Sequence, residues 1–406
     1  MINIERLNSG LSVVTEAMPA VKSASVGIWV GTGSREEPKE LGGASHFLEH
    51  LLFKGTSTRS SKQIAEDLDS VGGDSNAFTS REHTAFYVRL LADDIELGLD
   101  ILCDILCDPA LREDDVELER QVILEEIFMH ADEPAELAWE KCFQACYRDH
   151  SLGRDVQGSA DTVSAMTKDS IRSFWSNHYG YENIVVAAAG NIDHERIVEG
   201  VQKRMTLPNV KPPERIAPGD FAACRLWTHR PIEQANVVMA MPAFGRRDER
   251  RWALALLNHV LGGGLSSRLF QEIRENRGLV YSIGCDWSGF SDAGLISTSF
   301  GTSPDKVDTV IDLVNEQYKR ISESGITSRE LELARANLKA ETLLAYEDSG
   351  SRMVRLANST LYQGQVLEID QVLEKMLAVS LDDISALAAD IFAGPQIVSI
   401  VGPEKS

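Results

Sequence analysis

Apolar residues in the first half of the chain follow two different periods, and these predict alternating strands and helices. The nearly continuous apolar run Ala24–Val30 predicts a buried strand, and the helical spacing after it predicts a helix over Ala44–Leu52. A further strand-like segment, Phe86–Leu90, precedes a predicted helix over Asp93–Cys103. This mixture of strands and helices indicates an α+β fold.

The second half repeats this order of elements. It contains, in sequence, a predicted strand at Val237–Met241, a helix at Trp252–Leu261, a strand at Leu295–Phe300 and a helix at Pro304–Tyr318. Matches between single residues of the two halves are few, and they align Phe47–Leu51 with Leu256–Val260, Arg120 with Arg335, and Glu126 with Glu341. We therefore predict a tandem duplication into two homologous α/β-sandwich-like domains. Each is expected to have an antiparallel-rich sheet with helices on one face.

A proline-rich segment separates the halves. Pro208–Asp220 holds four of the 13 prolines and shows no hydrophobic period, which is typical of an extended linker. The predicted domains are therefore 1–207 and 221–406, with 208–220 between them.

Composition and charge narrow the possible partners. The chain has 406 residues, of which 43% are hydrophobic and 25% charged, so a disordered or fibrous protein is excluded. The net charge of −22 repels nucleic acid and anionic membrane surfaces and favours basic peptides. No apolar run approaches the roughly 18 residues that span a bilayer. The N-terminal segment also lacks the basic region followed by an apolar stretch that marks a secretory signal, so we expect a cytoplasmic protein.

The six cysteines include no CxxC pair. Cys103 and Cys107, like Cys142 and Cys146, are four residues apart in helix-like sequence, where a thiolate metal site is conceivable. Buried core cysteines are the favoured interpretation for a reducing compartment.

A candidate metal motif lies in the first predicted helix. His46 and His50 are four residues apart, so their imidazoles lie one above the other on a helix, roughly 5–6 Å apart at Cβ, and are able to chelate one ion. Glu49 projects from nearly the same face and could reach a metal-bound water. This is the HxxEH pattern, the reverse of HExxH. Two surface histidines beside a solvated glutamate are the alternative interpretation.

A carboxylate-rich helix is predicted over Glu113–His130, with Val116, Val122, Ile123 and Ile127 as its apolar positions. Glu119 and Glu126 are seven residues apart and therefore share one face of this helix. Such a face could supply a third zinc ligand and an outer carboxylate, as catalytic zinc sites require three protein ligands and one open position. From periodicity alone, a solvated acidic face is the favoured interpretation of this pattern.

These motifs, together with further segments along nearly the whole chain, resemble the pitrilysin family of inverted zinc peptidases. The resemblance is closest to the mitochondrial processing peptidase branch and its bacterial relatives. The matching segments are Leu7–Glu16, Gly33–Glu37, Ser45–Thr56, Ser75–Thr84, Glu119–Glu126, Gly190–Asn191, Leu261–Phe270 and Arg277–Tyr281.

The resemblance implies a role for each matched residue of the first half. His46, His50 and Glu126 match the ligands of one zinc ion per chain, whereas neighbouring Glu125 is one residue off the spacing. Glu49 matches the general base, and Glu119 matches a residue that supports the site without binding metal. In the second half His259 has no partner histidine, so this domain is expected to bind no zinc.

Substrate contacts are implied in the same way. Asn76, Ala77, Phe78 and Thr79 resemble the family's exposed edge strand, onto which an unfolded peptide adds. Arg274 and Tyr281 match a substrate-contacting pair of the C-terminal domain, although a salt-bridged arginine and a core tyrosine are the alternative. Gly262–Gly264 resembles a glycine-rich loop near the family's chamber, and a helix-ending turn explains it as well.

The expected function is therefore that of a zinc metalloendopeptidase that cleaves short or unfolded polypeptides in a closed chamber. Four-domain relatives place the zinc site and the Arg–Tyr pair on opposite sides of that chamber, so this shorter chain is expected to form a homodimer whose active site is completed in trans. A non-catalytic core subunit, or a processing subunit of a hetero-oligomer, is the alternative.

Overall fold

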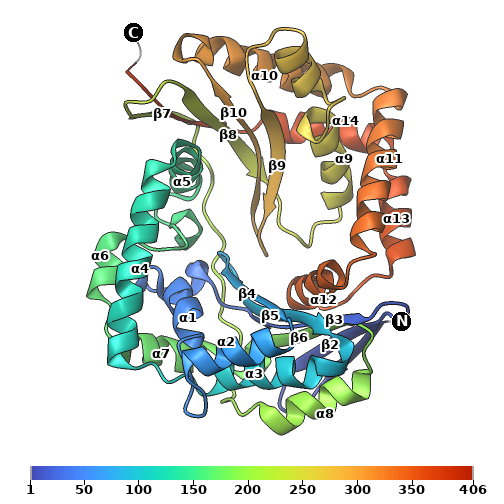
Figure 1. The fold of residues 1–406 in the computed structure, drawn as a ribbon. Coiled ribbons are helices and arrows are strands. Elements are labelled where there is room, and N and C mark those ends of the chain that lie inside the picture. Colours follow the sequence, from blue (N-terminus) through green and yellow to red (C-terminus); the bar gives the residue numbers. More distant parts are fainter. Residues whose placement is uncertain (1, 405–406) are drawn as a thin grey trace. The chain divides into compact units, whose positions relative to one another are not determined.

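Two mixed sheets organise residues 2–404, the part of the chain that the computed structural model describes (Figure 1). The first sheet has six strands in the order β1-β2-β6-β3-β5-β4, and all neighbours are antiparallel except β2 and β6. Its strands are β1 (Ile2–Arg6), β2 (Ser12–Ala17), β3 (Ser23–Val30), β4 (Asp74–Thr79), β5 (Thr84–Leu91) and β6 (Ile184–Gly190).

The second sheet repeats this topology. Its order is β7-β11-β8-β10-β9, and β7 and β11 form its parallel pair. Its strands are β7 (Cys224–His229), β8 (Ala235–Ala243), β9 (Ile283–Gly289), β10 (Gly294–Thr302) and β11 (Ile397–Gly402). Placing β2, β6, β3, β5 and β4 against β7, β11, β8, β10 and β9 matches every pairing, as a duplication predicts.

Each sheet belongs to a compact unit. Unit 1 comprises the described chain up to Phe128 together with Arg154–Ile216 and Leu344–Val366. Unit 2 comprises Met129–Gly153, Ala217–Leu343 and the described chain from Leu367 onward. The boundary at Ile216 falls inside the predicted linker.

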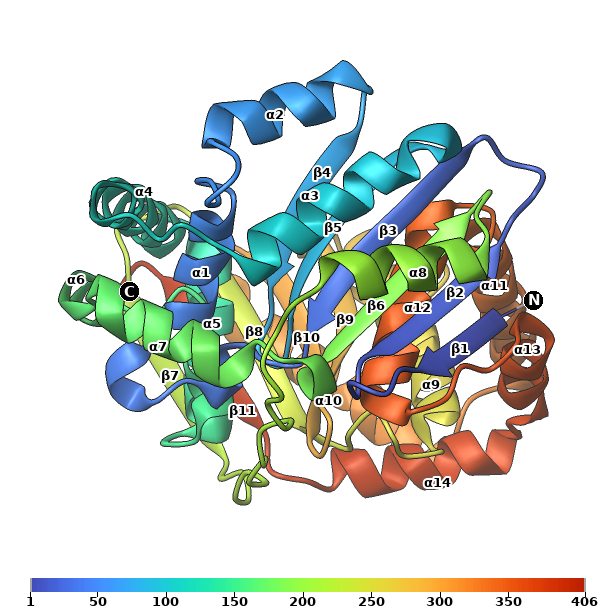
Figure 2. The same cartoon turned by 90° about the horizontal axis from the view of Figure 1, so that it is seen from below.

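In unit 1 the central strands β3 and β6 are buried on both faces. Val26 and Ile28 of β3 face a core shared with helices, whereas Trp29 faces the opposite side, as the two-residue period of a strand requires. Figure 2 shows α3 and α8 across the first of these faces. The helices of this unit are α1 (Ala44–Leu52), α2 (Ser61–Ser70), α3 (Ile95–Cys107), α6 (Ala160–Ala165), α7 (Lys168–His178), α8 (His194–Arg204) and α12 (Ser349–Gln363).

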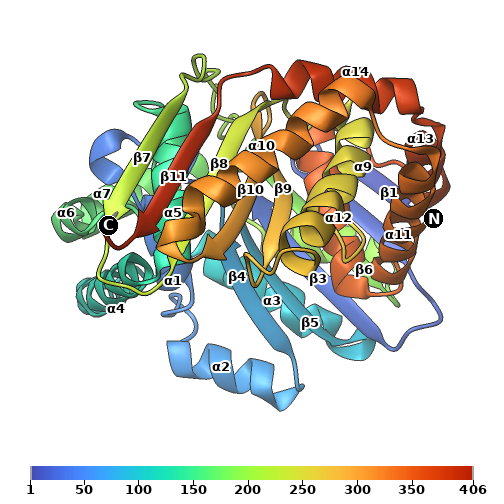
Figure 3. The same cartoon turned by 90° about the horizontal axis from the view of Figure 1, so that it is seen from above.

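Unit 2 is built in the same way, and Figure 3 shows α9 and α10 over its sheet. Its helices are α5 (Pro134–Tyr147), α9 (Arg251–Gly262), α10 (Val307–Ser324), α13 (Ile369–Ala378) and α14 (Leu381–Phe392). The helices α4 (Glu113–Asp132) and α11 (Ser328–Ala345) each run from one unit into the other.

One helix of each half of the sequence packs in the unit formed mainly by the other half. The compact units therefore differ from the predicted domains 1–207 and 221–406. In unit 1, α12 covers the second face of the sheet through Met353 and Leu356, and its Tyr362 hydroxyl lies 2.6 Å from His83 Nδ1. In unit 2, α5 covers the second face through Leu137 and Cys142. Each sheet thus has helices on both faces, and the prediction of helices on one face only is wrong in this respect. The second face of each sheet is also apolar and must be buried against another element.

The linker between the halves is extended but not free. Residues 205–223 contain no helix or strand. Within unit 1, the Arg215 guanidinium lies 2.7 Å from Glu36, and Arg35 Nη2 donates to the Ile216 carbonyl at 2.6 Å. This ion pair and this hydrogen bond fix the middle of the linker to unit 1.

The predicted α+β fold of two domains is confirmed, and most element boundaries agree within a few residues. The helix predicted over Asp93–Cys103 is observed as Ile95–Cys107. Val122, predicted to be an apolar packing position of α4, is 45% exposed, whereas Val116 and Ile123 are buried. Cys103, Cys142, Cys146 and Cys285 are core residues. Among the described helices none is long and apolar enough to cross a bilayer, and the cytoplasmic location stays a prediction.

Candidate metal centre

The metal motif lies on α1, which begins at a glycine. Gly43 has φ +95°, a left-handed conformation that favours glycine, and an added Cβ would lie 2.4 Å from the Gln157 carbonyl oxygen. The apolar side of α1 packs into the core through Phe47, Leu48, Leu51 and Leu52. The opposite side therefore presents His46, Glu49 and His50 together.

Three donor atoms converge at this face. His46 Nε2 and His50 Nε2 are 3.3 Å apart, and each lies 3.7 Å from Glu126 Oε2 on α4. Among the residues described, this is the one place where three histidine, cysteine or carboxylate donors gather within 4.8 Å of one another. Glu125, the neighbour of Glu126, is exposed and not part of the group.

The spacing of these atoms fits a zinc ion. Four ligands at bond lengths of about 2.0–2.2 Å stand roughly 3.3–3.6 Å apart at the corners of a tetrahedron. The observed separations of 3.3 and 3.7 Å are close to these values. Two imidazoles and one carboxylate are also the donor set of catalytic zinc sites that keep one position open.

Glu119 forms a hydrogen bond that orients His50. It is 3% exposed, and its Oε2 lies 3.0 Å from His50 Nδ1 while its Oε1 lies 2.6 Å from Lys54 Nζ. A proton held on Nδ1 by this carboxylate leaves the Nε2 lone pair directed at the donor cluster. Lys54 balances the buried charge of Glu119.

Gln157 supports the third ligand, and sequence reasoning missed it. Its Nε2 donates to Glu126 Oε1 at 2.8 Å, so the other carboxylate oxygen is turned toward the histidines. Gln157 is 8% exposed and lies in the loop before α6. A single polar residue in a loop follows no hydrophobic period, so the sequence did not indicate this contact. The one local feature was the neighbouring glycine, Gly158, which the structure shows at φ +78°.

Glu49 is held next to the cluster by β4. Thr79 Oγ1 donates to Glu49 Oε2 at 2.6 Å. Burial raises the pKa of Glu49, while the Thr79 hydrogen bond and the nearby His50 oppose this effect. The carboxylate is therefore fixed in orientation and can act as a proton acceptor.

The residues Asn76, Ala77, Phe78 and Thr79 all lie on β4, an edge strand whose single partner in the described sheet is β5. The Ala77 amide donates to Asn76 Oδ1 at 2.8 Å. Phe78 packs edge-on against His83 and Tyr87. The strand is thus half-buried and leads from an open sheet edge to Glu49.

Arg274 and Tyr281 lie together in unit 2. Arg274 belongs to a π-helical turn, Phe270–Glu275, and its guanidinium is 4.5 Å from the Phe270 ring centroid and 5.8 Å from that of Tyr281. Tyr281 is 85% exposed, so it is not the core tyrosine of the alternative interpretation. Arg274 is also paired with Glu275 at 3.1 Å. Gly262 ends α9, and Gly263 donates to the His259 carbonyl, which is a helix-ending turn.

Comparison with known proteins gives the family. Residues 12–160 match the family model described as Insulinase (Peptidase family M16), and residues 165–338 match the one described as Peptidase M16 inactive domain. The chain is 42% identical to a protein named uncharacterized zinc protease from Streptomyces coelicolor, over 98% of this chain and 89% of that protein. The chain belongs to the peptidase M16 family.

A further relative and two solved structures are also similar to this chain. An uncharacterized zinc protease of Bacillus subtilis is 33% identical over 99% of this chain and 98% of its own. Among solved structures, a protease from Helicobacter pylori superposes with a TM-score of 0.92 at 22% identity, covering 99% of this chain and all of that one. A Pseudomonas fluorescens structure described as a peptidase M16 inactive domain gives a TM-score of 0.93 at 19% identity, covering 99% of this chain and 98% of that one. The two structures show the same fold.

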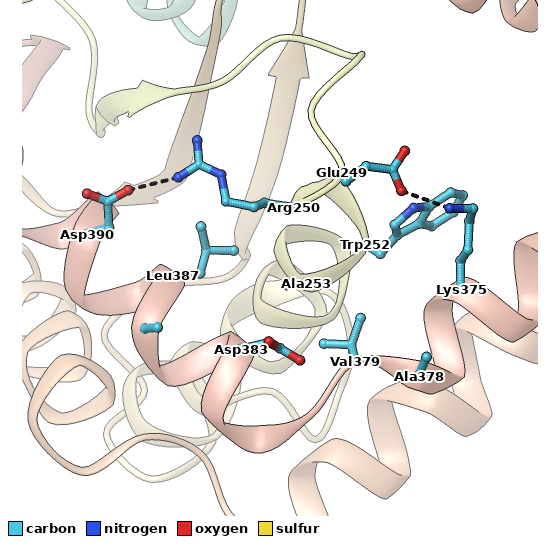
Figure 4. Close-up of a pocket in the computed structure, with 11 residues that line it drawn as sticks. Glu249, Arg250, Trp252, Ala253, Lys375, Ala378, Val379, Asp383, Leu387 and Asp390 are labelled. Carbon is cyan, nitrogen blue, oxygen red and sulfur yellow. Dashed lines mark hydrogen bonds and ion pairs between the residues drawn. The ribbon is translucent and has the colours of Figure 1, made fainter.

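Unit 2 of this M16 chain also contains a hollow between α9, α13 and α14, with a cavity volume of about 530 Å³ (Figure 4). Four of its charged groups form two ion pairs, Glu249 with Lys375 at 2.8 Å and Arg250 with Asp390 at 3.1 Å. Its apolar floor includes Ala253 and Leu387. Among the described residues, the hollow has no cluster of three potential metal donors.

Proposed function

We propose that this chain is a zinc-dependent endopeptidase that hydrolyses short or unfolded polypeptides and holds one zinc ion per chain at His46, His50 and Glu126. The observation that carries the proposal is the convergence of His46 Nε2, His50 Nε2 and Glu126 Oε2 within 3.3–3.7 Å. The family's zinc proteases make zinc the expected metal. When bound, zinc lowers the pKa of water toward about 7 and polarises a peptide carbonyl.

The protein's own residues handle the proton and the substrate. Glu49, oriented by Thr79, accepts the proton of the attacking water and later delivers it to the leaving amine. The open edge of β4 accepts an extended peptide through main-chain hydrogen bonds, which gives little sequence selectivity. The Asn76 side chain, which occupies the Ala77 amide, must move aside for that pairing. The net charge of −22 favours basic peptides.

Arg274 and Tyr281 are proposed to donate to the oxyanion that develops on the attacked carbonyl. Their exposure in unit 2 leaves both side chains accessible to a bound peptide. Following the resemblance to four-domain relatives, we propose a homodimer in which this pair completes the partner's zinc site inside a closed chamber.

The decisive experiment is cleavage of quenched, unfolded peptides by the purified protein. Activity should disappear with a chelator and return with one equivalent of zinc per chain. A protein that holds zinc fully and cleaves none of a broad peptide library would favour the alternative, a core or processing subunit that requires a different partner.

The trans arrangement has its own test. Glu49→Gln protein and Arg274→Ala, Tyr281→Phe protein, each nearly inactive alone, are mixed under conditions where subunits exchange. A mixed dimer holds one site with both defects and one with neither, so activity should partly return. Demonstrated exchange without recovery, or a fully active monomer, would contradict the dimer.

A further inference from the structure

The helix that carries the metal motif lacks a side-chain cap of its own. The first amides of a helix have no intrahelical acceptor, and a Ser, Thr, Asp or Asn at the N-cap normally supplies one. The N-cap of α1 is Gly43, which has no side chain. Its acceptor comes from Glu37, whose Oε2 accepts the Gly43 amide at 2.8 Å and whose Oε1 accepts the Ser45 amide at 2.7 Å.

Glu37 is an unusual cap because it is buried. The residue is 4% exposed, and burying a carboxylate is costly unless donors compensate. Burial raises the pKa of Glu37 to about 7, against the opposing effect of the two amides and Arg154. A solvent-exposed residue at the N-cap would satisfy the same amides at lower cost, so this placement requires a reason beyond helix capping.

Glu37 is tied to the segment that reaches the third ligand. Arg154 Nη2 donates to the Glu37 carbonyl at 2.7 Å, and three residues later Gln157 donates to Glu126. Close backbone contact joins the same two regions, since a Cβ on Gly158 would lie 2.2 Å from the Gly42 carbonyl oxygen. The start of α1 and the support of Glu126 therefore form one continuous contact.

We propose that Glu37 is a positioning residue of the metal centre, which fixes the start of α1 and thereby the place of His46 and His50 relative to Glu126. The proposal deepens the zinc-peptidase function proposed above and rests on the same donor cluster. It does not require that the bound metal be catalytically active.

The equivalent helix of unit 2 supports this role by contrast. At the start of α9, Asp248 Oδ1 accepts the Arg250 amide at 2.8 Å, a local contact two residues apart in which the Asp248 side chain is 28% exposed. No cluster of three potential donors lies on α9 in the described structure. The helix without metal ligands thus has a nearby, partly exposed acceptor and, among the residues described, no buried carboxylate from another segment.

The test compares two neighbouring glutamates. In Glu37→Gln the amide oxygen still accepts one backbone N–H, but its NH₂ faces the other, so one contact becomes repulsive. Glu36→Gln is the matched control, since the Glu36 side chain is 3% exposed and binds Arg215 and the Gly33 amide rather than the amides at the start of α1. For both variants we would measure zinc affinity by chelator competition, the visible spectrum of the cobalt-loaded protein, and thermal unfolding of the metal-free protein.

Glu37→Gln should weaken zinc binding about 10–100-fold, the range found when groups that orient metal ligands are removed, and should alter the cobalt spectrum. Glu36→Gln should lower stability while leaving zinc affinity and the spectrum unchanged. Wild-type zinc affinity in Glu37→Gln, or an equal loss in both variants, would overturn the proposal. If Glu37→Gln does not fold, Glu37→Asp, which keeps the charge but shortens the reach, is judged by the same criteria. A wild-type protein that binds zinc yet cleaves no peptide would contradict the proposed function alone.

Discussion

The helix pairs α1–α4 and α9–α11 follow equivalent strands of two sheets that share an order of five strands. Within the described residues, three potential metal donors gather on the first pair and not on the second. In the alignment of the halves, His46 and Glu49 correspond to Ala255 and Asn258, and Glu119 corresponds to Ala334. Among the matched metal-site positions, only those of His50 and Glu126 have the same residue type in the second half, as His259 and Glu341. Burial lowers the pKa of His259, with Glu341 opposing this effect, so a remnant of the His–Glu proximity persists.

What both pairs share is an arginine. Arg120 Nη2 donates to the Met166 carbonyl at 2.8 Å, just after α6, and Arg335 Nη2 donates to the Val379 carbonyl, just after α13. These two carbonyls precede equivalent helices, α7 and α14. The arginine therefore belongs to the duplicated scaffold, whereas the histidines and carboxylates belong to the function of the first half alone.

The largest effect is expected from the ligands. A His46→Ala, His50→Ala double variant should lose its zinc and all activity, because Glu126 alone cannot hold the ion. His259→Ala should retain one zinc per chain, since its helix offers no second histidine. Metal content of the purified proteins measures both. Full occupancy in the double variant, or zinc loss in His259→Ala, would break the comparison between the halves.

Glu49 distinguishes metal binding from turnover. Glu49→Gln should retain zinc and lower the rate of peptide cleavage roughly 10²–10⁴-fold or more, since an amide of nearly the same shape does not accept the proton. Glu125→Gln is the matched control, as it removes an exposed carboxylate beside Glu126. Steady-state cleavage and zinc content are measured together. Activity of Glu49→Gln within a few-fold of the wild type would exclude it as the base.

A substitution at Gln157 tests how the third ligand, Glu126, is oriented. Gln157→Leu keeps the side-chain volume but removes the donor to Glu126, so zinc affinity should fall about 10–100-fold. Gln144→Leu, which removes a glutamine contact to Glu140 on α5, should leave zinc affinity unchanged. Chelator competition measures both. An unchanged affinity in Gln157→Leu would mean that α4 alone orients Glu126.

Helices and strands with a regular hydrophobic period were predictable from the sequence, whereas contacts made by single polar residues were not. The four-residue spacing of His46 and His50 allows two imidazoles to chelate one ion, and the resemblance favoured this over two surface histidines. The order of strands and helices indicated the duplication. The sheet that each helix covers was not predictable, because an apolar face on α5 or α12 shows only that it must be buried.

The supports of the metal cluster were harder to find for a related reason. Glu37 reaches the amide of Ser45, and Gln157 reaches Glu126 across 31 residues of sequence. Neither contact follows from helix or strand periodicity. Resemblance supplied Glu119 and Glu126, while the sequence offered nothing that distinguished Glu37 from Glu36.

The smallest effect is expected at the shared arginine, where it should appear as stability. Arg335→Ala removes a charged donor to the Val379 carbonyl and should lower the free energy of unfolding by about 1.5–3 kcal/mol, without changing zinc content. Arg120→Ala should cost a similar amount and also weaken zinc binding, because Arg120 anchors the helix that carries Glu119 and Glu126. Denaturant unfolding of the metal-free proteins, together with zinc affinity, separates these effects. If Arg335→Ala weakened zinc binding as strongly as Arg120→Ala, the arginine would not be a local scaffold residue of each half, and the division between shared scaffold and first-half chemistry would fail.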